Sequence, residues 1–131
     1  MRLLLDTHIW LWSLLEPARL TGRVARALED EENELWLSPI SVWELLILVE
    51  KGRLSLDMPV EQWTERATKA GALKEAPVTQ EVALETRKVA LPHRDPADRF
   101  IAATARVFKL TLVTADQHLL GLRGLATLAN R

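Results

Sequence analysis

The 131-residue sequence predicts an α/β fold in which a parallel sheet carries helices on both faces. Short apolar runs, of which "RLLL" at 2–5 is the clearest, alternate with segments of helical length. These runs are continuously apolar, as is typical of strands that are buried on both faces. Hydrophobic residues make up 48% of the chain, which is enough for one real core. We therefore expect a single domain over residues 1–131.

The N-terminal half is predicted to begin with a strand and to contain four helices. Pro17 ends the first helix, and Thr21 can cap the second. Pro39 stands at the favoured first position of the third helix, which ends at Gly52, and the fourth has the same ending at Gly71. The predicted elements are a strand at 2–5, helices at 8–16 and 20–33, a strand at 34–38, and helices at 40–52 and 59–71.

The C-terminal half continues the alternation. Pro77 makes the next strand an edge strand at best, and Thr79 can cap the helix that follows it. The strongest helical pattern of the chain is "PADRFIAATARVFK". The predicted elements are a strand at 73–78, helices at 79–90 and 96–109, a strand at 110–116, a short helix at 117–122 and a strand at 125–129.

Composition excludes several classes of protein. Lys and Arg number 17 and Asp and Glu 18, so binding to a polyanion through bulk charge is disfavoured, whereas a local basic groove is not. Because there is no cysteine, the chain has no disulfide and no thiolate metal site. No apolar run is long enough to span a membrane, and the start is too soon interrupted by Asp6 for a signal peptide. We expect a soluble cytoplasmic protein.

Acidic residues follow two of the predicted strands. Asp6 ends the first strand, and Asp116 lies just past the strand that contains Thr114. Ligands of open α/β sheets bind beyond the carboxyl ends of the strands, so both acids are expected at one edge. Capping of the following helix explains either aspartate equally well.

Glu44 has an unusual setting on its predicted helix. Its neighbours one, three and four positions away are Ile40, Trp43, Ile47 and Leu48. A carboxylate among apolar positions is costly without a cation or metal as partner. The alternative is that the helix turns Glu44 to solvent at the border of a wide apolar stripe.

The stretch "HRDPADRFIAATA" at 93–105 contributes two more aspartates. Asp95 fits the N-cap of the helix, with Pro96 at its first position. Asp98 shares its side with Ile101 and Ala102, which should pack on the sheet. We therefore assign Asp95 mainly to capping, with a supporting role at the site left open, and place Asp98 in the site.

Four acids at one edge repel one another and raise each other's pKa values. A divalent cation would resolve this conflict, and the hard oxygen donors favour Mg²⁺ or Mn²⁺ over Zn²⁺. Ions held by such carboxylate clusters promote phosphodiester cleavage.

Four stretches of this sequence resemble the signature blocks of the PIN domain, and more narrowly those of VapC-type toxins: "LLLDTHIWLW", "SPISVWELLILVEKGRL", "HRDPADRFIAATA" and "LVTADQHL". They occur in the family's order between residues 3 and 119. The resemblance implies an α/β/α sandwich around a parallel sheet of four or five strands. It also implies a metal-dependent endoribonuclease that a small antitoxin holds inactive, and it suggests a homodimer.

The family's acidic residues fall on Asp6, Glu44, Asp98 and Asp116, and its small hydroxyl residue falls on Thr114. On this reading the three aspartates bind Mg²⁺, and Glu44 either completes the ligands or orients the attacking water. A non-catalytic PIN-like module that binds RNA or a partner, and a DNA nuclease with the same acids, are the alternatives. A phosphatase of another α/β family is disfavoured because it needs an acid where His8 stands.

Further polar and aromatic residues lie near the acids. Arg94 and Arg99 could hold RNA phosphates or pair with carboxylates. His8, His93 and His118 are expected to have polar surface roles rather than to bind metal. The tryptophans are expected to pack in the core or at interfaces rather than to stack on RNA, and the apolar helices 8–16 and 40–50 would suit an antitoxin helix or self-association. The tryptophans are Trp10, Trp12, Trp36, Trp43 and Trp63.

Overall fold

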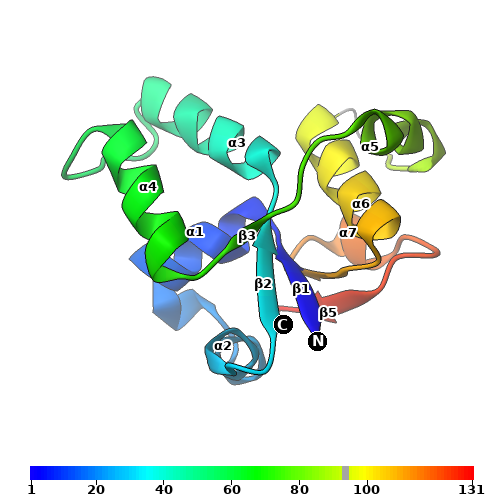
Figure 1. Cartoon of the computed structure of the whole chain (residues 1–131), viewed down its shortest axis with the longest axis horizontal. Helices are drawn as coiled ribbons and strands as arrows, with labels where there is room; N and C mark the ends of the chain where they lie inside the picture. The colour runs from blue at the N-terminus through cyan, green and yellow to red at the C-terminus, as the bar shows by residue number, and fades with distance from the viewer. Residues whose placement is uncertain (93–94) are drawn as a thin grey trace.

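The computed structural model describes residues 1–92 and 95–131 and contains a five-stranded parallel sheet in the order β3-β2-β1-β4-β5 (Figure 1). The strands are β1 (Arg2–Leu5), β2 (Glu34–Leu37), β3 (Lys74–Glu75), β4 (Thr111–Thr114) and β5 (Thr127–Ala129). At the centre Leu4 pairs with Trp36 of β2 on one side and with Leu112 of β4 on the other. The predicted α/β/α sandwich with a parallel sheet is confirmed.

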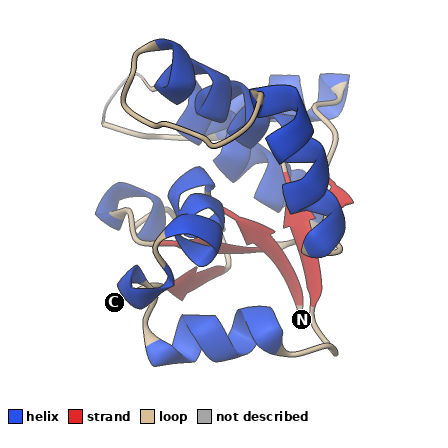
Figure 2. Cartoon of the chain, turned by 90° about the vertical axis from the view of Figure 1, so that its left-hand side faces the viewer, coloured by secondary structure: helices blue, strands red, loops and turns tan. Residues whose placement is uncertain are grey.

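Helices cover both faces of this sheet (Figures 1 and 2). The side chains of β1 alternate between two apolar clusters: Leu3 and Leu5 pack with residues of α1 to α4, and Leu4 packs with residues of α5 to α7. None of the helices in the described ranges is long and apolar enough to cross a membrane. The helices are α1 (Thr7–Leu15), α2 (Gly22–Glu29), α3 (Pro39–Glu50), α4 (Val60–Ala70), α5 (Gln80–Glu85), α6 (Pro96–Phe108) and α7 (Gln117–Leu120).

Several predicted elements were too long. Helix α2 stops at Glu29 rather than at residue 33, because the acidic residues that follow form a turn into β2. Helix α5 ends at Glu85 and continues only as a 3₁₀ turn at Thr86–Lys88. Strand β3 has two residues and lies at the edge of the sheet, as Pro77 led us to expect.

The ends of α3 and α4 share one geometry with different residues. Gly52, at a φ of 68°, takes the left-handed position after α3, as predicted. Helix α4 ends at Gly71, as predicted, but the left-handed residue is Ala72, at a φ of 50°, and not Gly71. The next residue explains the shift, because Leu73 N–H donates to Thr68 O and thereby places Ala72 at the left-handed position.

Replacing Ala72 with glycine is expected to stabilise the protein by about 0.5–1 kcal/mol, because glycine adopts this φ without a Cβ penalty. Ala70→Gly is the matched control, since it places the same change inside α4, where glycine weakens the helix. Urea unfolding of both variants measures the difference. Equal effects of the two substitutions would contradict the assignment of the strained residue.

Candidate functional site

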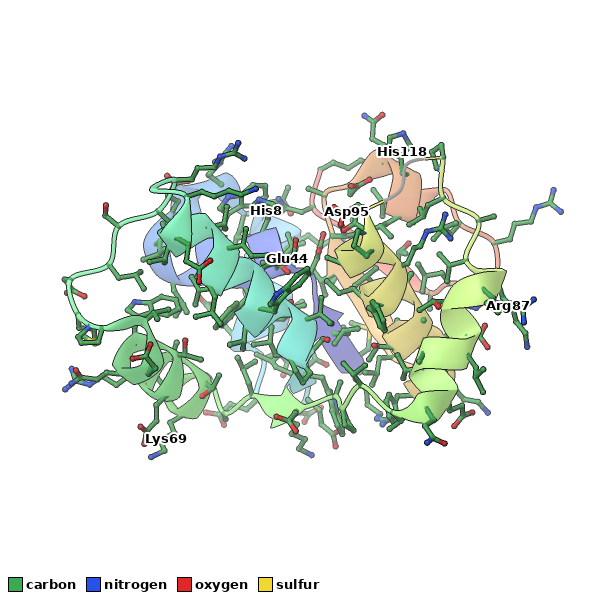
Figure 3. The ribbon with its side chains drawn as sticks, turned by 90° about the horizontal axis from the view of Figure 1, so that it is seen from above. His8, Glu44, Lys69, Arg87, Asp95 and His118 are labelled. Carbon is green, nitrogen blue, oxygen red and sulfur yellow. The ribbon has the colours of Figure 1, made fainter. Side chains whose placement is uncertain are left out.

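Five carboxylates line one cavity of about 350 Å³ at the carboxyl edge of the sheet. Figure 3 shows Glu44 on α3 and Asp95 at the start of α6 on opposite sides of this space, with His8 of α1 beside Glu44. The structure thus brings together all four acids that the sequence placed at the site, and adds Asp95. The lining residues are Asp6, His8, Trp12, Glu44, Asp95, Asp98, Ala115 and Asp116.

Asp6 is the most enclosed of these acids, with only 7% of its surface exposed. Its Oδ1 accepts the N–H of Thr7 at 2.9 Å, and its Oδ2 accepts the hydroxyl of Thr114 at 2.7 Å. Burial raises the pKa of Asp6, and these two hydrogen bonds oppose the rise. Asp6 therefore both caps α1 and stands in the cavity wall, so the two roles left open by the sequence coexist.

Thr114 links two of the strand-end acids. Its hydroxyl donates to Asp6 and accepts the N–H of Asp116 at 3.0 Å. Asp116 in turn caps α7, because its Oδ1 accepts the N–H groups of His118 and Leu119 at 2.7 and 3.3 Å. The buried hydroxyl of Thr114 thus fixes Asp6 relative to Asp116 at the ends of the paired strands β1 and β4.

Glu44 is half-buried and borders the cavity, while its neighbour Trp43 is 46% exposed. The hydroxyl of Thr7 donates to Glu44 Oε1 and also lies 2.8 Å from Ser41 Oγ. Burial raises the pKa of Glu44, and the negative charges of Asp6 and Asp95 raise it further.

Thr7 holds Glu44 through its hydroxyl, Ser41 contacts the same hydroxyl, and the sequence reasoning missed both of them. Thr7 directly follows Asp6, and Ser41 lies three positions before Glu44 on one helix. That spacing places Ser41 beside Glu44 on the helix surface, which is the signal that could have found it.

Asp95 and Asp98 differ in burial and in role, as the sequence suggested, but both line the cavity. Asp95 is exposed and caps α6, with its Oδ1 accepting the N–H of Ala97 at 3.0 Å. Asp98 is half-buried, and its pKa rises to about 7 through burial first and then through the charges of the other four acids. Asp95 also lines the cavity and contributes to that charge, which a purely capping role does not explain.

Not all of the basic residues that the sequence placed near the acids line the cavity. Arg99 donates from Nη1 to the carbonyl of Val89 at 2.8 Å and is not among the residues that line the cavity. His118 Nδ1 lies 3.7 Å from Asp116 Oδ1. His93 and Arg94 lie outside the described residues.

The chemistry of the donor set fits a divalent cation, because it consists of carboxylates crowded enough to raise the pKa of Asp98. In the described residues no group of three or more His, Cys, Asp or Glu side chains already has the geometry to hold a metal ion.

Thr114→Val is expected to destabilise the protein by about 1–3 kcal/mol, because it leaves a buried carboxylate oxygen and the N–H of Asp116 without their partner. Thr114→Ser keeps the hydroxyl and should lose less stability. Thermal unfolding of the pair measures this difference. Equal destabilisation by both substitutions would show that the methyl group, and not the hydroxyl, matters.

Comparisons with known proteins agree with this arrangement. Residues 3–125 match the family model of the PIN domain. Ribonuclease VapC22 of Mycobacterium tuberculosis (strain ATCC 25618 / H37Rv) is 39% identical over 119 residues, which cover 88% of each chain.

Solved structures of toxin–antitoxin complexes share the fold. VapBC2 from Rickettsia felis, bound to a DNA fragment from their promoter, matches with a TM-score of 0.71 at 16% identity over 98% of both chains. FitAcB from Neisseria gonorrhoeae matches with a TM-score of 0.63 at 26% identity over 98% of this chain and 97% of that chain.

Proposed function

Because the chain belongs to the PIN-domain family, we propose that it is the endoribonuclease toxin of a toxin–antitoxin pair. The observation that carries the proposal is the convergence of Asp6, Glu44, Asp98 and Asp116 on one cavity. The similarity to a ribonuclease over most of the chain supports the reaction class.

The three aspartates would hold Mg²⁺, with Mn²⁺ as a possible substitute, directly or through water. When bound, the ion would activate water and offset the negative charge that develops on the phosphodiester. Glu44 would either complete the ligand set or accept a hydrogen bond from the attacking water. The Thr7 hydroxyl orients the Glu44 carboxylate for either role.

The chain's own hydrogen bonds prepare the site for this chemistry. Thr7 N–H and the Thr114 hydroxyl hold the carboxylate of Asp6 in one orientation, so little reorganisation of this group is needed when substrate binds. Because the pKa of Asp98 is raised to about 7, a cation bound beside this group would readily displace its proton.

The proposal includes a cellular setting. The toxin would act on RNA in the cytoplasm as a homodimer and would be inhibited by a cognate antitoxin protein. Structural neighbours described as a toxin–antitoxin complex and as a member of a family of toxin–antitoxin systems support the antitoxin partner.

The function is tested by incubating purified protein with RNA in Mg²⁺, in EDTA, and as the Asp6→Asn variant. We expect cleavage only by the unsubstituted protein with Mg²⁺. Cleavage that survives both EDTA and the substitution would refute a metal-dependent nuclease. A parallel reaction with single-stranded DNA tests the DNA-nuclease alternative, and RNA binding without cleavage would favour a non-catalytic module.

A further inference from the structure

A second cleft, of about 210 Å³, adjoins the acidic cavity and shares two residues of its wall, His8 and Trp12. Both residues come from α1, four positions apart, so they lie on one face of that helix. Whatever occupies the acidic cavity can therefore extend into this cleft past the same two rings. The cleft is lined by His8, Leu11, Trp12, Leu15, Glu16, Arg19, Leu48, Arg53 and Leu54.

The aromatic part of the cleft brings three planar groups together. The rings of His8 and Trp12 lie 5.8 Å apart at 52°. The guanidinium of Arg19 lies over the Trp12 ring, 4.5 Å from its centroid. Arg19 also pairs with Glu16 at 3.1 Å, and both side chains are more than half exposed, so the guanidinium can shift to admit another planar group.

Arg53 supplies a second cation from the other side of the cleft. It directly follows Gly52, whose left-handed conformation ends α3, and its backbone N–H donates to Leu48 O. Its side chain is exposed and, within the described part of the chain, has no ion pair or side-chain hydrogen bond. The turn after α3 thus presents a cation that no neighbour in that part of the chain neutralises.

The acidic cavity and the adjoining cleft differ in charge in a way that suits a polynucleotide. The acidic cavity repels phosphate groups, so a strand held there must find its cations beside the acids rather than among them. Arg19 and Arg53 lie in the adjoining cleft, whose aromatic wall offers the face on which a base of any sequence stacks.

We propose that this cleft is the subsite for the nucleotide next to the scissile phosphate of a single-stranded RNA. The base stacks against Trp12 and the Arg19 guanidinium, and Arg53 binds the adjoining phosphate. This inference rests on the proposed function for its substrate class. It assigns RNA contacts to Trp12, for which the sequence had favoured packing over RNA stacking.

The test measures binding of a short fluorescent single-stranded RNA to the Asp98→Asn protein, in which cleavage does not deplete the ligand. In this background Trp12→Leu, which keeps apolar packing, and Arg53→Ala are each expected to raise the Kd about tenfold. Arg53→Ala should also lower the slope of log K against log salt by about 0.7, as expected for one lost phosphate contact on a single strand. Trp12→Phe should retain most of the affinity.

Arg23→Ala is the matched control. It removes one exposed cation from α2, at the end of the sheet opposite α3 (Figure 1). Its Kd and salt slope should stay close to those of the parent protein. In cleavage assays of the otherwise unsubstituted chain, Trp12→Leu and Arg53→Ala should raise KM more than they lower kcat.

Failures of this inference and of the proposed function are distinguishable. If the unsubstituted protein cleaves RNA and both cleft variants bind and cleave as it does, the subsite is wrong and the nuclease stands; a cleft reserved for a protein partner would give this result. If no RNA is cleaved but binding still depends on Trp12 and Arg53, the cleft binds RNA as inferred and the nuclease is wrong.

Discussion

Asp98→Asn is expected to reduce RNA cleavage at least about a thousandfold, whereas Asp95→Asn should retain most of the activity. Asp98 stands half-buried among four other carboxylates, and asparagine cannot supply a charged ligand there. Asp95 accepts the N–H of Ala97, and asparagine caps a helix as well as aspartate does. Initial rates of RNA cleavage at saturating Mg²⁺ measure both effects.

The Asp95 variant is the informative one, because Asp95 also lines the cavity. Circular dichroism and thermal unfolding should show that both variants are folded. Equal loss of cleavage in the two would mean that Asp95 belongs to the ligand set and that its capping bond is secondary.

Divalent cations are expected to stabilise the protein strongly at pH 8 and little at pH 5. The pKa of Asp98 is raised from 3.8 to about 7 in the folded chain. Between these values the folded state binds more protons than the unfolded state, so in EDTA this group's contribution to stability falls as pH rises to about 7. Above that pH, Mg²⁺ at about 100 times its Kd should raise the free energy of unfolding by about 2.7 kcal/mol.

Thermal unfolding in Mg²⁺ and in EDTA, at matched ionic strength, measures this linkage. Asp98→Asn serves as the control, because it removes the titrating group. In EDTA it should be more stable than the parent protein at pH 8, and its stability should change less with pH. A stabilisation by Mg²⁺ that is the same at pH 5 and pH 8 would contradict cation binding at these carboxylates.

The order of strands and helices was predictable because short apolar runs and capping residues are local signals. Thr21, Thr79 and Asp95 all cap the helices that the sequence assigned to them. Helix ends were less predictable where the position of the closing backbone hydrogen bond decides them. The end of α4 depends on the contact that Leu73 makes, so the left-handed residue became Ala72 although a glycine preceded it.

The site residues also divide into those that the sequence could predict and those that it could not. Asp6 and Asp116 were identified because parallel strands bring their carboxyl ends to one edge, and Glu44 and Asp98 because they share helix faces with apolar residues. The structure places all four around one cavity. The Thr7 hydroxyl was missed because its partners, Ser41 and Glu44, lie on another part of the chain. Arg99 was expected to bind phosphate or to pair with a carboxylate. Its hydrogen bond to the carbonyl of Val89 holds the guanidinium away from the residues that line the cavity.

The two roles of Asp6 and Asp116, in helix capping and at the cavity, have a genetic consequence. Asp6 and Asp116 cap helices with the same side chains that face the cavity, and asparagine preserves such caps. A single-base change from an aspartate to an asparagine codon would therefore silence the proposed enzyme without unfolding it. Cells selected for escape from such a toxin should accumulate these alleles, and the silenced chains would still sequester the antitoxin.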